Sequence, residues 1–249
     1  MVSYRKDYQL FKTMIESNPP QPSHRNMHKL RSFYRTTREA TQRVLPPPLE
    51  APANPEGYIY HLYSEQPAYG KPQYESAQFV KARFRDRDGW YLLSNYVETD
   101  AALWIGRELF GLPKRMGKIN LVRDGSKITG TTSRHGRELI TAEMTITHAE
   151  PHEPYLETWT TKWAMSSEGE LEYARLISLP YRVDQKESFV GTGQVNFGES
   201  DSDPVAELEV VEPLPSRYIL FDHYRGPATM LFEFDPKEFY PFLTARMLG

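Results

Sequence analysis

The sequence predicts an α+β protein that is mainly β, with an antiparallel, barrel-like sheet and a few peripheral helices. Many short segments rich in aromatic and β-branched residues follow one another, and turn-forming residues separate them. Few stretches show the apolar period of a helix. A long series of short strands joined by tight turns is typical of a sheet that closes, or nearly closes, on itself.

The composition is that of one domain, residues 1–249, with an N-terminal helix and linker over residues 1–26. The formal net charge is −3 and 39% of the residues are hydrophobic, so a core can form and neither a nucleic acid nor a membrane is expected as a partner. There is no cysteine, which excludes disulfides and thiolate chemistry. No apolar segment has the length of a signal or a transmembrane helix, so we expect a soluble, cytoplasmic protein.

The N-terminal third is expected to hold two helices and the first strand. Residues 3–16 have the apolar spacing of an amphipathic helix, and a proline-containing linker follows to about Asn26. Residues 30–34 are expected to form a strand. Residues 37–45 are expected to form a short helix, which the prolines from Pro46 onward end.

From residue 58 onward the pattern favours strands. We expect them over residues 58–63, 75–84, 90–97, 119–123, 127–132, 138–147, 155–164, 173–183, 190–196, 206–211, 217–224 and 228–234. Asp124 and Gly125 are typical of the tight turn of a β-hairpin. Asp235 and Pro236 are typical of the first residues of a helix, which we expect to reach residue 248.

A helix expected over residues 101–110 leads to a candidate catalytic lysine. Gly111 and Pro113 end the helix, and Lys114 and Arg115 follow on a tight turn. A lysine held among apolar residues beside a permanent cation is expected to have a lowered pKa, and only a neutral amine attacks a carbonyl carbon. On residue types alone, however, a Lys-Arg pair in a loop is more often a solvated surface feature.

Three motifs resemble those of the acetoacetate decarboxylase family. GRELFGLPKRMGKINL at residues 106–121 is similar to the family signature GRE-x-x-x-(F/Y)-PKK-x-x. YRTTREATQRVLPPPLE at residues 34–50 and ESFVGTGQVNF at residues 187–197 are similar to two further landmarks of the family. The resemblance covers most of the chain and implies a central β-barrel with the lysine inside, which agrees with the pattern of strands.

The resemblance also implies catalytic residues. In this family the first lysine of the pair forms a Schiff base with the substrate, and the second supplies positive charge beside it. Lys114 is thereby implied as the nucleophile, and Arg115 stands in the place of the second lysine. Glu75 has the spacing of a family glutamate that lines the active site, where a carboxylate can transfer a proton or orient the lysine. The alternative for Glu75 is a solvated glutamate at the edge of a strand.

Several positions depart from the family pattern, and four residues at or beside them are expected to bind the substrate. Tyr60 replaces a second family glutamate and is followed by His61. Asn95 replaces a methionine and precedes Tyr96, which corresponds to the family's tyrosine. These differences suggest that the imine chemistry is retained around a different substrate.

The N-terminal strand departs from the family as well. The active-site arginine of the family falls on Met27, and Arg25 can replace it only with a shift of the alignment. His148 and His152 are the best candidates for a metal site, but Pro151 prevents the helix that would bring both rings to one face. No metal is therefore expected, and the Schiff-base chemistry that the resemblance implies needs no organic cofactor.

The sequence thus predicts a Schiff-base lyase acting on a small keto acid, by decarboxylation of a β-keto acid or a related reaction. An aldolase or aldolase–dehydratase acting on a pyruvate-like keto acid is the first alternative. A non-catalytic barrel that binds a small molecule is the second. We expect a homo-oligomer.

Overall fold

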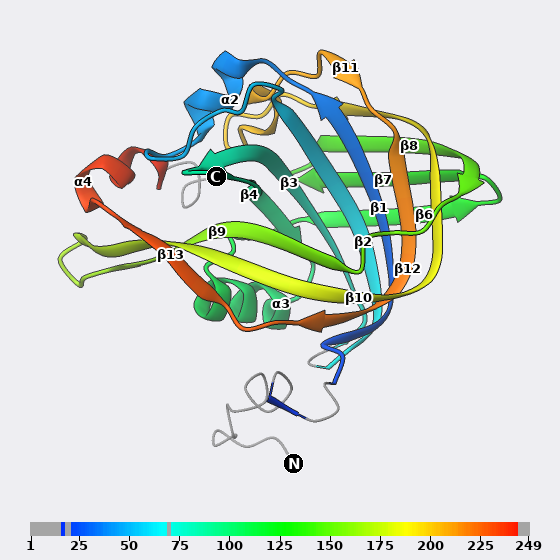
Figure 1. Cartoon of the computed structure of the whole chain (residues 1–249), viewed down its shortest axis with the longest axis horizontal. Coiled ribbons are helices and arrows are strands. Elements are labelled where there is room, and N and C mark those ends of the chain that lie inside the picture. The colour runs from blue at the N-terminus through cyan, green and yellow to red at the C-terminus, as the bar shows by residue number, and fades with distance from the viewer. Residues whose placement is uncertain (1–15, 18–20, 69–70, 244–249) are drawn as a thin grey trace.

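The strands of the computed structural model form one strongly curved sheet, with short helices at its margin (Figure 1). The structure describes residues 16–17, 21–68 and 71–243. The helix expected over residues 3–16 therefore lies outside the described residues except for Glu16, and the end of the expected C-terminal helix, beyond residue 243, lies outside them too.

The elements, in chain order, are β1 (His24–Arg35), α2 (Arg38–Val44), β2 (Glu56–Pro67), β3 (Gln73–Phe84), β4 (Arg87–Val97), α3 (Asp100–Trp104), the π-helix η1 (Ile105–Leu109), β5 (Lys114–Met116), β6 (Lys118–Asp124), β7 (Lys127–Arg134), β8 (Arg137–Ala149), β9 (Tyr155–Met165), β10 (Leu171–Phe197), the 3₁₀ helix η2 (Val205–Glu207), β11 (Glu212–Pro213), β12 (Ser216–Arg225), β13 (Thr229–Phe234), α4 (Pro236–Phe239) and the 3₁₀ helix η3 (Tyr240–Phe242).

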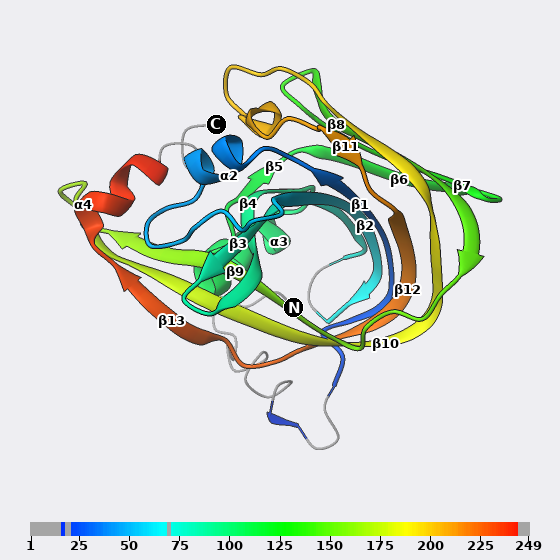
Figure 2. The same ribbon diagram turned by 45° about the horizontal axis from the view of Figure 1, so that its top comes forward.

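A closed circuit of strand pairings surrounds the interior of the molecule. It runs through β1, β2, β3, β4, β9, β10 and β12, and β12 pairs with β1 again. The pairings are antiparallel except that between β4 and β9, which is parallel. This circuit, whose curvature is visible in Figure 2, confirms the mainly β, barrel-like fold class that the sequence predicts.

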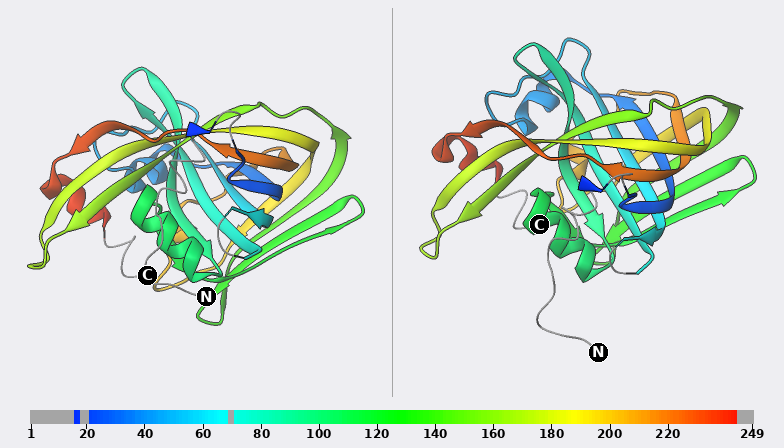
Figure 3. Two further views of the ribbon diagram at one scale, coloured as in Figure 1. Left: turned by 90° about the horizontal axis from the view of Figure 1, so that it is seen from below. Right: turned by 60° about the horizontal axis from the view of Figure 1, so that its bottom comes forward.

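An arm of three strands extends the sheet outside the circuit. β8 pairs with β10, β7 with β8, and β6 with β7 (Figure 3). The arm folds over the outer face of the circuit, where Thr132 of β7 donates a hydrogen bond to Ser76 of β3 at 2.6 Å. The turn between β6 and β7 lies at Asp124 and Gly125 as expected, and Gly125 has the positive φ of 58° that this turn requires.

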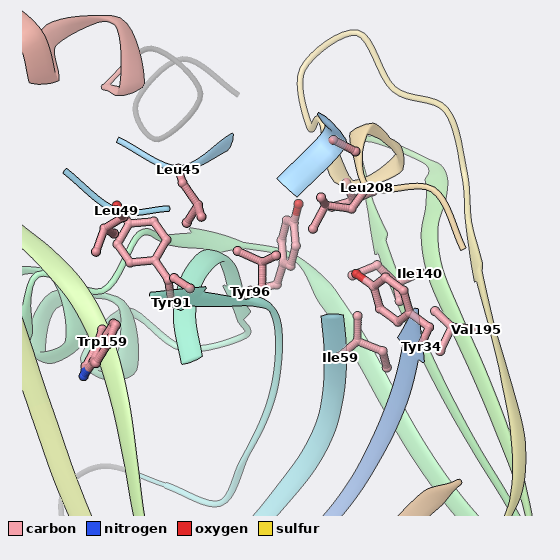
Figure 4. Packing of buried hydrophobic residues seen from close by; sticks show 14 of the residues in the cluster. Tyr34, Leu45, Leu49, Ile59, Tyr91, Tyr96, Ile140, Trp159, Val195 and Leu208 are labelled. Carbon is pink, nitrogen blue, oxygen red and sulfur yellow. The ribbon is translucent and has the colours of Figure 1, made fainter. Parts of the chain in front are cut away.

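Side chains of the circuit strands alternate between two apolar cores. The inner core lies inside the circuit and includes Tyr60, Phe79 and Phe221. The larger, outer core lies on the other face of the circuit strands, where it includes residues of the arm, α2 and α4. Members of this core that Figure 4 labels are Tyr34, Leu45, Leu49, Ile59, Tyr91, Tyr96, Ile140, Trp159, Val195 and Leu208. Because successive residues of a strand point to opposite faces, neighbours in the sequence belong to different cores.

Two expectations about the strands are wrong. Residues 173–183 and 190–196 do not form two strands but belong to the 27-residue β10, which pairs with β9 and β13 in its first half and mainly with β12 and β8 in its second. Register shifts, such as that between Gln185 and Glu187, let one strand bend from one set of neighbours to the next. Residues 206–211 form no strand, because η2 and a turn bring Val205 and Leu208 into the outer core instead.

Candidate active site

The inside of the circuit holds a cavity of about 90 Å³. Inward-facing residues of β1, β2, β3, β4 and β12 form part of its wall, and η1 closes it on another side through Ile105 and Gly106. Lys114, Glu75, Tyr60 and Asn95, all singled out in the sequence, line this one cavity. Charged and polar groups from four strands thus meet in one cavity.

Lys114 enters the cavity from a short strand rather than from the turn that the sequence indicates. β5 pairs in parallel with β4, which sets Lys114 beside Asn95. The lysine is only 3% exposed, and its Nζ donates a hydrogen bond to Oε2 of Glu75 at 2.7 Å. A paired strand fixes the direction of the side chain more firmly than an isolated turn would.

The π-helix η1 packs directly on the stem of Lys114. A Cβ atom at Gly106 would lie 2.3 Å from Cδ and 2.5 Å from Cε of the lysine, so no larger residue fits there without displacing the side chain. Single π-turns occur frequently at functional sites. The sequence predicts one helix over residues 101–110, whereas the structure divides it into α3 and η1.

Glu75 accepts hydrogen bonds from three side chains in the cavity. Besides Lys114 it accepts hydrogen bonds at Oε1 from the hydroxyl of Tyr60 at 2.5 Å and from Nδ2 of Asn95 at 3.1 Å. Burial alone would raise the pKa of Glu75, but the charge of Lys114 and these hydrogen bonds outweigh it and lower the pKa to about 2. Glu75 is therefore a carboxylate at neutral pH, held in one orientation by three donors.

Arg115 lies on the opposite face of β5, outside the cavity. Its NH1 donates to Oδ1 of Asp203 at 2.7 Å, and Arg134 and Tyr96 donate to the same carboxylate. We call these four residues the Asp203 cluster. Arg115 and Tyr96, both expected near the substrate, thus hold residues 202–203 against the outer face of the sheet.

His61 also lies away from the cavity. It is completely buried between the circuit and the arm, where its Nε2 lies 3.0 Å from Oγ1 of Thr132. Burial lowers the pKa of His61 to about 3, so the ring is neutral at physiological pH. Its position fits a role in joining the arm to the circuit.

One lysine in the cavity was not identified from the sequence. Lys29 of β1 is 7% exposed, and its Nζ lies 4.1 Å from the centre of the Tyr60 ring. Burial, and next the charge of Arg31, lower the pKa of Lys29 to about 7, against a raising effect of Glu75. The period-2 pattern of residues 27–33 could have indicated it, because Met27 and Phe33 lie on the same face as Lys29.

The described residues show no cluster of three or more histidine, aspartate or glutamate side chains with the geometry of a metal site. Within the same residues, no helix has the length and apolar character needed to cross a membrane.

The family model for acetoacetate decarboxylase matches residues 11–233. Acetoacetate decarboxylase 3 of Mesorhizobium japonicum is 32% identical over 117 residues, which are 47% of this chain and 45% of that protein. The CLA biosynthesis isomerase of Lactiplantibacillus plantarum is 24% identical over 230 residues, and the match covers 81% of this chain and 79% of the isomerase.

Solved structures show the same fold. An acetoacetate decarboxylase structure superimposes with a TM-score of 0.80 at 22% identity, and covers 92% of this chain and 99% of its own. The enduracididine biosynthesis enzyme MppR, in complex with the condensation product of pyruvate and imidazole 4-carboxaldehyde, has a TM-score of 0.70 at 18% identity. That match covers 85% of this chain and 89% of MppR.

Proposed function

The chain belongs to the acetoacetate decarboxylase family, and from this premise we propose that it is a lyase that forms a Schiff base between Lys114 and a keto acid. The observation that carries the proposal is the contact between Lys114 and Glu75 inside the cavity. A lysine within the family signature, buried and facing a cavity, is suited to carbonyl chemistry.

The reaction follows from the groups on the cavity wall. The neutral amine of Lys114 attacks the keto carbon, water leaves, and a cationic iminium forms. The iminium withdraws electrons from the adjacent carbon–carbon bond, so a β-carboxylate departs as CO₂ and leaves an enamine. Protonation of the enamine and hydrolysis of the iminium release the ketone and restore the lysine.

Glu75 supports these steps as a fixed anion. Its carboxylate accepts the hydrogen bond of Lys114, and it can balance the positive charge when the amine becomes an iminium. Tyr60 and Asn95 hold the other oxygen of Glu75, so the carboxylate is oriented before the substrate enters. The cation of Arg115 pairs with Asp203 on the other face of the sheet, so Glu75 is the charged group that contacts the amine of Lys114.

Aldol chemistry at the same lysine is the second candidate. The enamine that forms after loss of CO₂, or after deprotonation of a pyruvate-like imine, can attack an aldehyde instead of a proton. The similarity in fold to MppR, seen with the condensation product of pyruvate and an aldehyde, favours this candidate. Tyr60 and Asn95, where the family pattern has glutamate and methionine, offer hydrogen bonds to a larger or hydroxylated substrate.

The test compares turnover by the purified protein. CO₂ release from acetoacetate is measured beside aldol and retro-aldol turnover of aryl and alkyl keto acids. We expect weak decarboxylation of acetoacetate and faster reaction of a bulkier keto acid or an aldol donor. A kcat for acetoacetate in the ordinary range of about 1–10³ s⁻¹ would contradict this expectation and would indicate that the protein is an acetoacetate decarboxylase. No imine and no turnover with any keto acid would favour a non-catalytic binding protein.

A cytoplasmic location and a homo-oligomer complete the proposal. They can be checked by cell fractionation and by sedimentation of the purified protein.

A further inference from the structure

Lys29 is a second amine in the same cavity as Lys114. It is nine-tenths buried and faces the cavity, but its Nζ forms no hydrogen bond or ion pair with any described residue. Its Nζ lies over two aromatic rings, 4.1 Å from the ring centre of Tyr60 and 5.8 Å from that of Tyr181. Contacts with ring faces offset only part of the free-energy cost of burying an ammonium group.

The described residues that line the cavity include two amines but one carboxylate. The amines are those of Lys29 and Lys114, and the carboxylate is that of Glu75. Glu75 is already hydrogen-bonded to Lys114. His24 and His223 do not change this balance, because burial lowers the pKa of His24 to about 3 and that of His223 well below its usual value. A bound anion would therefore supply the negative charge that Lys29 lacks.

We propose that Lys29 is the residue that binds the carboxylate of the keto acid whose keto carbon reacts with Lys114. This inference rests on the proposed function, because it assigns the two lysines separate tasks on one substrate. The ligand class is a small keto acid with one carboxylate near the carbonyl. The ammonium of Lys29 donates charge-assisted hydrogen bonds to that carboxylate, and the keto group is directed to Lys114.

A purely structural role does not explain Lys29. A methionine has a stem of similar length, and in the space between the rings of Tyr60 and Tyr181 it would avoid the cost of burying an unpaired ammonium. Carboxylate binding, by contrast, uses the charge and stabilises the protonated form of the amine. The orientation of Lys29 toward the cavity is the observation that favours this use.

The experiment compares a keto acid with a neutral ketone. Wild type, Lys29→Met and the control Lys127→Met are treated with borohydride and either pyruvate or acetone, and the adducts are counted by intact mass. Lys127 is a suitable control because it is an exposed lysine of β7. We expect Lys29→Met to lower trapping of sub-saturating pyruvate at least about tenfold, as the loss of about 1.4 kcal/mol would, and to leave acetone trapping within about twofold. Lys127→Met should trap both as wild type does.

Three results would overturn the assignment: an equal loss of both adducts, no loss of the pyruvate adduct, or a pyruvate adduct that peptide mapping locates on Lys29 itself. If wild type traps neither compound, the proposed function fails and a second measurement decides the inference alone. Calorimetry with isobutyrate, a carboxylate that cannot form an imine, compares wild type with Lys29→Met. Binding at least about tenfold weaker in the variant supports a carboxylate site at Lys29, and equal binding refutes it.

Discussion

Lys114 and Arg115 are neighbours in β5 whose charged groups end on opposite faces of the sheet. Nζ of Lys114 lies 2.7 Å from Glu75 inside the circuit, whereas NH1 of Arg115 lies 2.7 Å from Asp203 outside it. A charge that is paired with a buried carboxylate on another face has little influence on the amine. Arg115 is therefore placed to hold Asp203 on the outer face, and it does not contact the amine of Lys114.

The first prediction concerns Arg115→Gln. The variant keeps a polar side chain but leaves Asp203 with fewer donors, so we expect a loss of about 1–3 kcal/mol in the free energy of unfolding. The pH profile of borohydride trapping should stay that of wild type. Urea denaturation and trapping at several pH values measure the two effects, and Arg115→Lys is the charge-retaining control. A shifted trapping profile with unchanged stability would show that Arg115 acts on the reaction.

The second prediction concerns Glu75→Gln. The substitution keeps the size of the side chain but removes the carboxylate that Lys114 contacts, and we expect turnover to fall about 10²-fold or more. Turnover that remains within a few-fold of wild type would remove Glu75 from the catalytic machinery.

The same residue gives a prediction for stability at low pH. Folding lowers the pKa of Glu75 from 4.5 to about 2, so its contribution to stability is complete above pH 4.5 and is lost as the pH falls toward 2. The difference in Tm between wild type and Glu75→Gln should therefore be larger at pH 6 than at pH 3. A constant difference across this range would mean that Glu75 does not form the ion pair in solution.

The third prediction concerns the stability that the protein loses by burying the amine of Lys29. Folding lowers the pKa of Lys29 from 10.5 to about 7. Between these pH values the amine is protonated in the unfolded chain and largely neutral in the folded one. The free energy of unfolding therefore rises with pH from 7 to 10.5 as far as Lys29 contributes to it. Lys29→Met should raise the Tm at pH 7, without ligand, and this gain should shrink toward pH 10. A variant that is less stable than wild type at pH 7 would show that the amine of Lys29 stabilises the folded state.

The fourth prediction concerns Gly106→Ala. A Cβ atom there would meet the stem of Lys114 at 2.3 Å, so we expect the lysine to be displaced and trapping to fall. The double variant Gly106→Ala, Lys114→Ala is the control, because removal of the stem leaves room for the new methyl group. The stability cost of Gly106→Ala should largely disappear in the double variant. An equal cost with and without the lysine stem would locate the clash elsewhere.

Most strands could be predicted from the sequence because alternating apolar residues and tight turns are local signals. β10 could not, since its partners β8, β9, β12 and β13 are distant in the chain and their pairing alone continues the strand through its bends. The same applies to the packing of η2 into the outer core.

The lining of the cavity could be predicted in part, and the residues that lie outside it do so for one reason. Family motifs identify single positions, but in a strand the next residue points to the other face. Tyr60 and Asn95 accordingly line the cavity, whereas His61 and Tyr96 do not. Lys29 was missed because the first strand was expected to start at residue 30, although β1 begins at His24.

Peptide mapping after borohydride reduction with a panel of keto acids tests the central proposal most directly. The wild-type protein should carry one covalent adduct, on Lys114, and Lys114→Ala should carry none. An adduct on Lys118 or Lys127, or on the same peptide in the Lys114→Ala protein, would contradict the assignment of Lys114 as the nucleophile.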